Sequence, residues 1–190
     1  GEVEVIDFRE VAPRKATQDM FQVDGEVKEE WTIRGGKSVG VPGEPAGLWA
    51  MSHKWGELDW KTLVEPPRKL AAEGYPVHKE LADRLRSDAD KLENWPKLAA
   101  AFKEEDGSWV DEGDILKRPQ LGKLLGEFKE QGIESFYHGE IAKDIVETVN
   151  EKGGIFTRED LRHYAIQMRS PVQGTYRGYK IFSMPPSSSG

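Results

Sequence analysis

The stretch SFYHGEIAKDIVETVNEKGG, residues 135–154, carries the clearest signals of local structure in this 190-residue chain. Ile141, Ile145 and Val149 recur every four residues, a spacing that places all three side chains on one face of an α-helix. The pair Gly153-Gly154 follows directly, and glycine readily adopts the left-handed conformation that ends many helices. The stretch therefore predicts an amphipathic helix that packs on a core and stops at this glycine pair.

Further helix signals lie on both sides of this stretch. Downstream, Thr157 and Asp160 have the spacing of a capping box, so TREDLRHY should begin a short helix. Upstream, apolar residues at helical spacing predict amphipathic helices over 78–92 and 119–131. From Leu58 the pattern predicts two more helices, one to about Glu65 and one that starts with Pro66-Pro67 and stops at Gly74.

The strand signals are shorter and lie near the two ends of the chain. Alternating apolar residues predict a strand from Val3 to Phe8, and Pro13 interrupts the pattern. Near the other end, VQGTYRGYKIFSM predicts two strands joined at Arg177-Gly178. The glycine- and proline-rich stretch 22–49 is interpreted as a loop with one short strand around 39–41. The sequence thus indicates an α+β fold rich in helix, and its length suits a single domain over residues 1–190.

The composition excludes several classes of function. The formal charge is −7, whereas a nucleic-acid-binding protein needs clustered Lys and Arg, so nucleic acid is not an expected partner. Cysteine is absent, which excludes disulfides, thiolate nucleophiles and zinc sites built from cysteine. No apolar run approaches the roughly 18 residues that a transmembrane helix requires.

Motifs for metal, phosphate or serine chemistry do not emerge either. The four histidines lack the spacing of metal ligands, and no metal or cofactor is expected. Residues 34–43 lack the pattern of a phosphate-binding loop, and the serines at 187–189 lack the Gly-x-Ser-x-Gly motif. Asp7 and Glu10 could form a pair of acid-base carboxylates only if the strand ends between them, because residues three apart on a strand point to opposite faces.

Arg9 is the candidate binding residue. A guanidinium is a rigid fork that suits a carboxylate, and the end of a packed strand holds such a group still. From spacing alone, however, a surface ion pair with Glu10 or another acid is the favoured interpretation.

A family resemblance changes the interpretation of Arg9. The segments IDFREVAP and ATQDMF resemble the large subunit of gamma-glutamyltranspeptidases. The similarity continues in the same order through the Pro42-Gly43 loop, through Phe136-Tyr137-x-Gly139 and Gly153-Gly154, and to Pro-Pro-x-Ser-Ser-Gly at 185–190. Several such segments in order over nearly the whole chain identify the chain as resembling this family.

The resemblance implies a fold and a reaction. The fold is the αββα sandwich of N-terminal-nucleophile hydrolases. In the reaction, a threonine that self-cleavage exposes at the start of a small subunit attacks the gamma-glutamyl amide of glutathione or a related compound. The acyl group then passes to water or to an amino acid or peptide. Arg9 coincides with the family's arginine and would bind the alpha-carboxylate of the gamma-glutamyl group.

The resemblance also implies that the chain is an internal fragment. We expect a partial large subunit that lacks the family's first strand, its glycine-rich segment, and the small subunit with the nucleophile. No catalytic residue is therefore assigned, and the chain alone is expected to be inactive. A periplasmic or secreted location is implied by the resemblance only. Two alternatives stay open: a related cephalosporin acylase or poly-gamma-glutamate-processing enzyme, and a non-catalytic helical interaction module.

Overall fold

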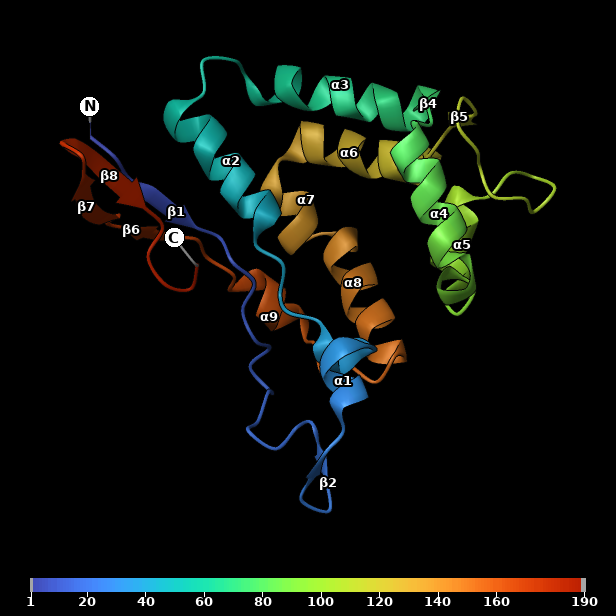
Figure 1. Ribbon diagram of the computed structural model, residues 1–190, viewed down its shortest axis with the longest axis horizontal. Helices are drawn as coiled ribbons and strands as arrows, with labels where there is room; N and C mark the ends of the chain where they lie inside the picture. Colours follow the sequence, from blue (N-terminus) through green and yellow to red (C-terminus); the bar gives the residue numbers. More distant parts are fainter. Residues whose placement is uncertain (1, 189–190) are drawn as a thin grey trace. The chain divides into compact units, whose positions relative to one another are not determined.

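The computed structural model describes residues 2–188, and these divide into two compact units. The first unit combines the chain up to residue 60 with the segment from residue 131 onward, and the second is residues 61–130. Figure 1 shows their helices and strands along the chain. The described residues form helices and short two-stranded sheets, which confirms the helix-rich α+β prediction.

The first unit contains all but two of the short strands and the helices nearest the two ends of the chain. Its elements are β1 (Val5–Asp7), β2 (Gln22–Val23), β3 (Glu26–Val27), α1 (Glu29–Ile33), a 3-10 turn (Gly36–Ser38), α2 (Glu44–Trp55), α7 (Ile133–Tyr137), α8 (Glu140–Glu151), α9 (Arg158–Arg162), β6 (Gln167–Arg169), β7 (Val172–Tyr176) and β8 (Tyr179–Ser183).

The strands of this unit pair as antiparallel two-stranded sheets. β7 and β8 form the predicted hairpin, whose turn residues Arg177 and Gly178 have φ angles of 49° and 84°. β1 pairs with β6, placing Ile6 opposite Met168. The sequence predicted β1 but not its partner β6. It also missed the β2–β3 hairpin, although Asp24 and Gly25 have the positive φ angles of a tight hairpin turn.

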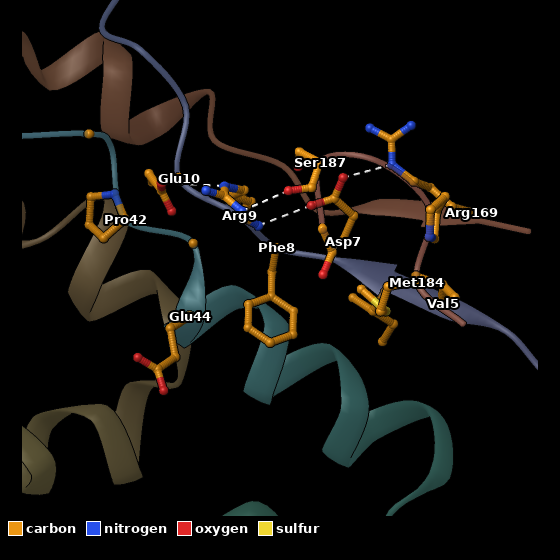
Figure 2. Close-up of a pocket in the computed structure, with 15 residues that line it drawn as sticks. Val5, Asp7, Phe8, Arg9, Glu10, Pro42, Glu44, Arg169, Met184 and Ser187 are labelled. Atoms are coloured by element: carbon orange, nitrogen blue, oxygen red, sulfur yellow. Dashed lines mark hydrogen bonds and ion pairs between the residues drawn. The ribbon is translucent and has the colours of Figure 1, made fainter. Parts of the chain in front are cut away.

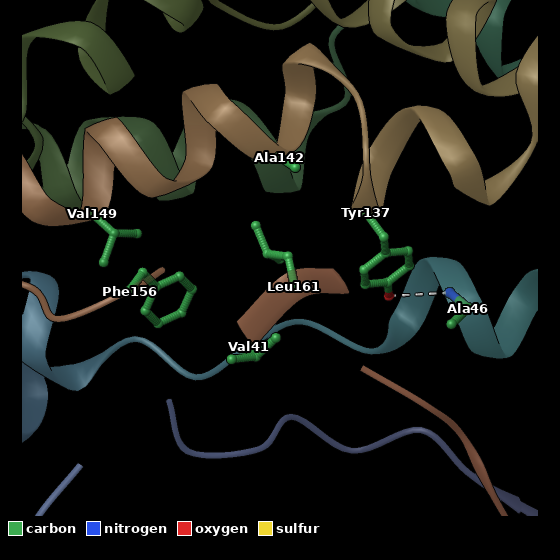
Figure 3. Packing of buried hydrophobic residues seen from close by; sticks show 7 residues of the cluster. All are labelled: Val41, Ala46, Tyr137, Ala142, Val149, Phe156 and Leu161. Atoms are coloured by element: carbon green, nitrogen blue, oxygen red, sulfur yellow. Dashed lines mark hydrogen bonds between the residues drawn. The ribbon is translucent and has the colours of Figure 1, made fainter. Parts of the chain in front are cut away.

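The core of the first unit lies where α8 and α9 meet the 41–46 segment (Figure 3). Its buried members are Val41, Ala46, Tyr137, Ala142, Val149, Phe156 and Leu161. The predicted amphipathic helix is confirmed, because Ile141 and Val149 are buried on α8 and Ile145 packs against the cluster. Gly153 has a φ angle of 80°, as the predicted helix end requires.

The segment 22–49, which the sequence interpreted as a loop, contains the short helix α1 and the start of α2. α2 begins at Glu44, and Pro45 is accommodated in its first turn. The glycines that indicated a loop serve close packing instead: a Cβ on Gly47 would lie 2.3 Å from the ring of Phe8. The expected strand around 39–41 is reduced to a single bridge between Val11 and Val41.

The second unit consists of α3 (Trp60–Glu73), β4 (Tyr75–Pro76), α4 (Lys79–Leu92), α5 (Pro96–Ala99), a 3-10 turn (Ala100–Phe102), β5 (Ile115–Leu116) and α6 (Pro119–Gln131). α4 and α6 confirm two predicted helices. A second core combines Ala82 and Leu85 of α4 with Val77, Val110 and Leu116 from the segments around it.

The prediction of two helices between Leu58 and Gly74 is wrong. α3 is one continuous helix with Pro66 and Pro67 in its interior. Both prolines lie on the exposed face of the helix. Water can therefore bind the carbonyl groups that lose an amide partner, and the buried face, with Val64 and Ala71, stays regular.

Candidate functional site

A pocket of about 500 Å³ lies at the end of β1, within the first unit. Four segments line it: residues 5–10, residues 40–44, Arg169 on β6, and residues 184–188 after β8 (Figure 2). The chain thus brings together residues that are more than 180 positions apart in sequence. Arg9 is among the lining residues, as is the Pro42-Gly43 loop.

The guanidinium of Arg9 lies beside the main chain of the 184–188 segment. Its Nη1 donates a hydrogen bond of 2.7 Å to the carbonyl oxygen of Ser187, and its Nε lies 3.5 Å from Oε1 of Glu10. The side chain is 56% exposed, so the group is open to a ligand as well as bound at one edge. The ion pair with Glu10 that spacing alone favoured is present, but its length and exposure make it weak.

The main chain of Arg9 is held at both of its polar groups. Its N–H donates to Oδ1 of Asp7 at 3.1 Å, and its carbonyl oxygen accepts a hydrogen bond of 2.9 Å from the hydroxyl of Tyr164. Asp7 also accepts a hydrogen bond of 2.7 Å from Nε of Arg169. The N–H of Arg9 and the guanidinium of Arg169 together hold the pKa of Asp7 below its usual value.

The two acids considered as a catalytic pair both line the pocket. β1 ends at Asp7, which is the condition under which Asp7 and Glu10 could share a site. Their contacts differ, however, because Asp7 binds Arg169 and the main chain of Arg9, whereas Glu10 contacts the guanidinium of Arg9. Asp7 is therefore ionised in an ion pair, and its lowered pKa makes it a poor general acid and a weak base at neutral pH.

Glycine is required where the 40–44 loop approaches β1. A Cβ on Gly43 would lie 1.9 Å from the hydroxyl oxygen of Tyr164 and 2.1 Å from the carbonyl oxygen of Phe8. A Cβ on Gly40 would lie 2.7 Å from the side chain of Glu10. The contacts at Gly43 leave no room for a side chain, so this glycine allows the loop to lie close to β1, whereas at Gly40 the exposed Glu10 side chain would have to move.

The other sequence candidates do not form sites in the part of the chain that the structure describes. Histidine and carboxylate side chains form no group of three that could hold a metal ion there. Ser187 and Ser188 line the pocket, and Ser189 lies outside the described residues. The helices between residues 2 and 188 are too short or too polar to span a bilayer.

Three contributors to the site escaped the sequence reasoning. Arg169, Tyr164 and the carbonyl of Ser187 contact Arg9 or Asp7 from positions more than 150 residues away. No local pattern marks such partners. The resemblance at 185–190 was the one signal that pointed to the 184–188 segment.

Comparison with known proteins supplies the family. The family model described as Gamma-glutamyltranspeptidase matches residues 1–190. Scoloptoxin SSD14 of Scolopendra dehaani is 40% identical over 98% of this chain and 32% of its own length. The glutathione hydrolase proenzyme of Escherichia coli (strain K12) is 39% identical over 100% of this chain and 33% of its own. The chain thus spans about a third of the length of these relatives.

Solved structures agree with this comparison. The gamma-glutamyltranspeptidase of Helicobacter pylori superposes with a TM-score of 0.92 and 38% identity, covering 97% of this chain and 53% of that one. A cephalosporin acylase from Bacillus halodurans gives a TM-score of 0.85 and 26% identity, covering 95% of this chain and 34% of that one. The fold is therefore a portion of the N-terminal-nucleophile hydrolase fold that the resemblance implied, and the chain belongs to the gamma-glutamyltranspeptidase family.

Proposed function

We propose that this chain is the carboxylate-binding part of a gamma-glutamyl-transferring or gamma-glutamyl-hydrolysing enzyme. Arg9 binds the alpha-carboxylate of the gamma-glutamyl group of glutathione or a related compound. A threonine outside this chain forms the acyl-enzyme, which passes to water or to an amino acid or peptide. The partner that brings this threonine is a small subunit cut from the same precursor.

The position of Arg9 is the observation that carries this proposal. Its side chain is half exposed on a pocket, its main chain is fixed on both sides, and one edge of its guanidinium already binds an oxygen acceptor. An arginine so held offers a carboxylate a charged fork with little further ordering on binding. The names of the E. coli and H. pylori proteins give the reaction class.

The test uses two donors that differ only at the alpha-carboxylate. The complete, processed protein is assayed with a gamma-glutamyl anilide and with the methyl ester of the same anilide. Arg9→Lys should raise KM for the free acid at least about tenfold, because an ammonium ion cannot reproduce the two parallel hydrogen bonds of the fork. The KM for the ester should change little. Arg14→Lys is the matched control, since Arg14 is an exposed arginine of the same loop outside this pocket.

An unchanged KM for the acid in Arg9→Lys would remove Arg9 from the binding site. The same two donors also test the acylase alternative, which is considered because the chain is similar in structure to the B. halodurans cephalosporin acylase. An enzyme that accepts the ester and the acid equally well has a pocket for a different acyl group. A preference for the free acid supports the gamma-glutamyl assignment.

The exposed hairpin bears on the alternative of a non-catalytic interaction module. Within the described residues, the β7–β8 sheet has two strands. Large apolar side chains are exposed along both of them, at Val172, Tyr176, Tyr179, Ile181 and Phe182. Unpaired strand edges with such side chains favour additional strands of the same enzyme over a helix-mediated interface.

A further inference from the structure

The main chain of Arg9 is bound by two side chains that approach it from different elements. Oδ1 of Asp7, at the end of β1, accepts its N–H at 3.1 Å, and the hydroxyl of Tyr164, two residues after α9, donates to its carbonyl at 2.9 Å. β1 ends at Asp7, so Arg9 itself has no ladder hydrogen bonds of its own. Its peptide orientation depends on these two contacts.

Asp7 is itself fixed. Its side chain is only 14% exposed, and Nε of Arg169 on the paired strand β6 donates to Oδ2 at 2.7 Å. Its two carboxylate oxygens therefore have separate tasks: one binds the neighbouring strand and the other binds the N–H of Arg9. Because these contacts favour the ionised form, the pKa of Asp7 is lowered and the carboxylate is charged at neutral pH.

Tyr164 is fixed by aromatic packing. Its ring stacks on Tyr137 with centroids 5.6 Å apart and an interplanar angle of 9°. Tyr137 is buried in the core cluster and donates to the carbonyl of Pro42 at 2.9 Å. The hydroxyl that reaches Arg9 thus belongs to a ring that cannot move independently of the core.

We propose that Asp7 and Tyr164 are positioning residues that set the direction of the Arg9 guanidinium for carboxylate binding. The proposal rests on the function proposed above. An exposed arginine has several rotatable side-chain bonds, and any rotation of its main chain adds to this freedom. The direction of the guanidinium is therefore better defined when the main chain is held. Two hydrogen bonds on either side of its Cα remove the peptide rotations that would swing the side chain out of the pocket.

The alternative is that these contacts only stabilise the fold. The two roles predict different results. If the contacts only stabilise the fold, a variant that lacks one of them loses activity toward every donor. Loss of position affects only the donor whose carboxylate Arg9 binds. The ratio of KM for the methyl ester to KM for the free acid therefore reports on positioning and is insensitive to folding.

The experiment compares Tyr164→Phe, Asp7→Ala and Asp7→Asn in the complete, processed protein. Tyr164→Phe removes one oxygen atom and keeps the ring stack. Asp7→Asn keeps an oxygen that can accept the N–H of Arg9, whereas Asp7→Ala does not. Tyr137→Phe is the matched control, since it removes a hydroxyl from the other ring of the stack, and that hydroxyl contacts Pro42 and Ala46 rather than Arg9. Each variant is assayed with both donors and by thermal unfolding.

We expect Tyr164→Phe and Asp7→Ala each to lower the ester-to-acid KM ratio about fivefold, the loss expected from one main-chain hydrogen bond. The ratio for Asp7→Asn should stay within about twofold of the wild-type ratio, because the amide oxygen of Asn can still accept the N–H of Arg9. Tyr137→Phe should lower the unfolding temperature and leave the ratio unchanged, because it keeps the ring that stacks on Tyr164 and removes no hydrogen bond to Arg9.

Two results would overturn the proposal. Suppose that Arg9→Ala lowers the ester-to-acid KM ratio to about one, but Tyr164→Phe and Asp7→Ala leave the ratio unchanged. Arg9 then binds the carboxylate without their help, and the proposed function still stands. If Arg9→Ala itself leaves the ratio unchanged, the carboxylate binds elsewhere and both proposals are wrong. Should Asp7→Ala fail to fold, Tyr164→Phe alone decides, because it changes the packing least.

Discussion

Asp160 joins the start of α9 to the loop that continues from Arg9, and replacing it tests how that loop is held. Its Oδ2 accepts hydrogen bonds of 2.7 Å from both the N–H and the hydroxyl of Thr157, which with the return bond to Thr157 forms the predicted capping box. Its Oδ1 accepts the N–H of Arg14 at 2.7 Å. Asp160 is 4% exposed, so its carboxylate is shielded from water and relies on these bonds.

The cost of Asp160→Ala follows from the groups that it leaves unpaired. Two partly buried main-chain N–H groups, on Arg14 and Thr157, lose their acceptor, and each such loss costs about 1–3 kcal/mol. We therefore expect a local destabilisation of about 3 kcal/mol. This corresponds to a more than hundredfold increase in the equilibrium constant for the local opening that exposes these amides to exchange. Asp160→Asn should cost about half as much, because its amide oxygen can still accept one of the two N–H groups.

Amide hydrogen exchange measures both amides directly. The peptides that contain Arg14 and Thr157 should exchange faster in Asp160→Ala in the complete protein, while peptides from residues 61–130 should not. Glu159→Gln is the control, since Glu159 is an exposed neighbour on the same short helix. If the Arg14 peptide keeps wild-type protection in Asp160→Ala, the capping box does not hold this loop and the reasoning is wrong.

Three further predictions concern the core, the pH dependence and the maturation of the protein. Leu161→Ala should lower the unfolding free energy by about 3 kcal/mol, because Leu161 is fully buried; a loss below about 1 kcal/mol in urea denaturation would contradict the packing described. Hydrogen bonds from Arg68 and Lys129 lower the pKa of Glu65 from 4.5 to about 2. A lowered pKa stabilises the fold above pH 4.5, and that contribution is lost as pH falls toward 2, so Glu65→Gln should flatten the stability profile in this window; identical profiles would refute it. Intact-mass analysis of the product of the complete gene should reveal two chains, the smaller beginning with threonine, and a single uncleaved chain would contradict the proposed maturation.

The parts of the fold that follow from local sequence were predicted correctly. The stripe on α8, the left-handed Gly153 and the capping box at Thr157 all follow from residues within four positions of one another. The hairpin turn at Arg177-Gly178 is equally local. In these cases the residues that determine a structural feature belong to the same helical turn or the same hairpin as the feature itself.

Errors arose where distant residues decide the local structure. The glycines and prolines around α2 indicated a loop, but Gly47 is needed for contact with Phe8, almost forty residues earlier. Pro66 and Pro67 indicated a helix boundary, but they lie on an exposed face and leave α3 continuous. Proline and glycine have several structural uses, and the sequence alone does not show which one applies.

The same limit applies to the candidate site. The resemblance identified Arg9, and the end of an apolar strand explained why an arginine there would be held still. The partners that hold it, Asp7 excepted, come from residues 164–187. The contact between Arg169 and Asp7 belongs to the β1–β6 pairing, which no local pattern predicted.

The most direct test of the central claim is a crystal structure of the complete, processed protein with glutamate bound as the product of hydrolysis. We predict that both oxygens of the alpha-carboxylate lie about 2.7–2.9 Å from nitrogens of the Arg9 guanidinium, the distance of a charge-assisted pair. The main chain of Arg9 should keep its contacts with Asp7 and Tyr164. An alpha-carboxylate bound to another cation, with Arg9 still on Ser187 and Glu10 alone, would contradict the assignment.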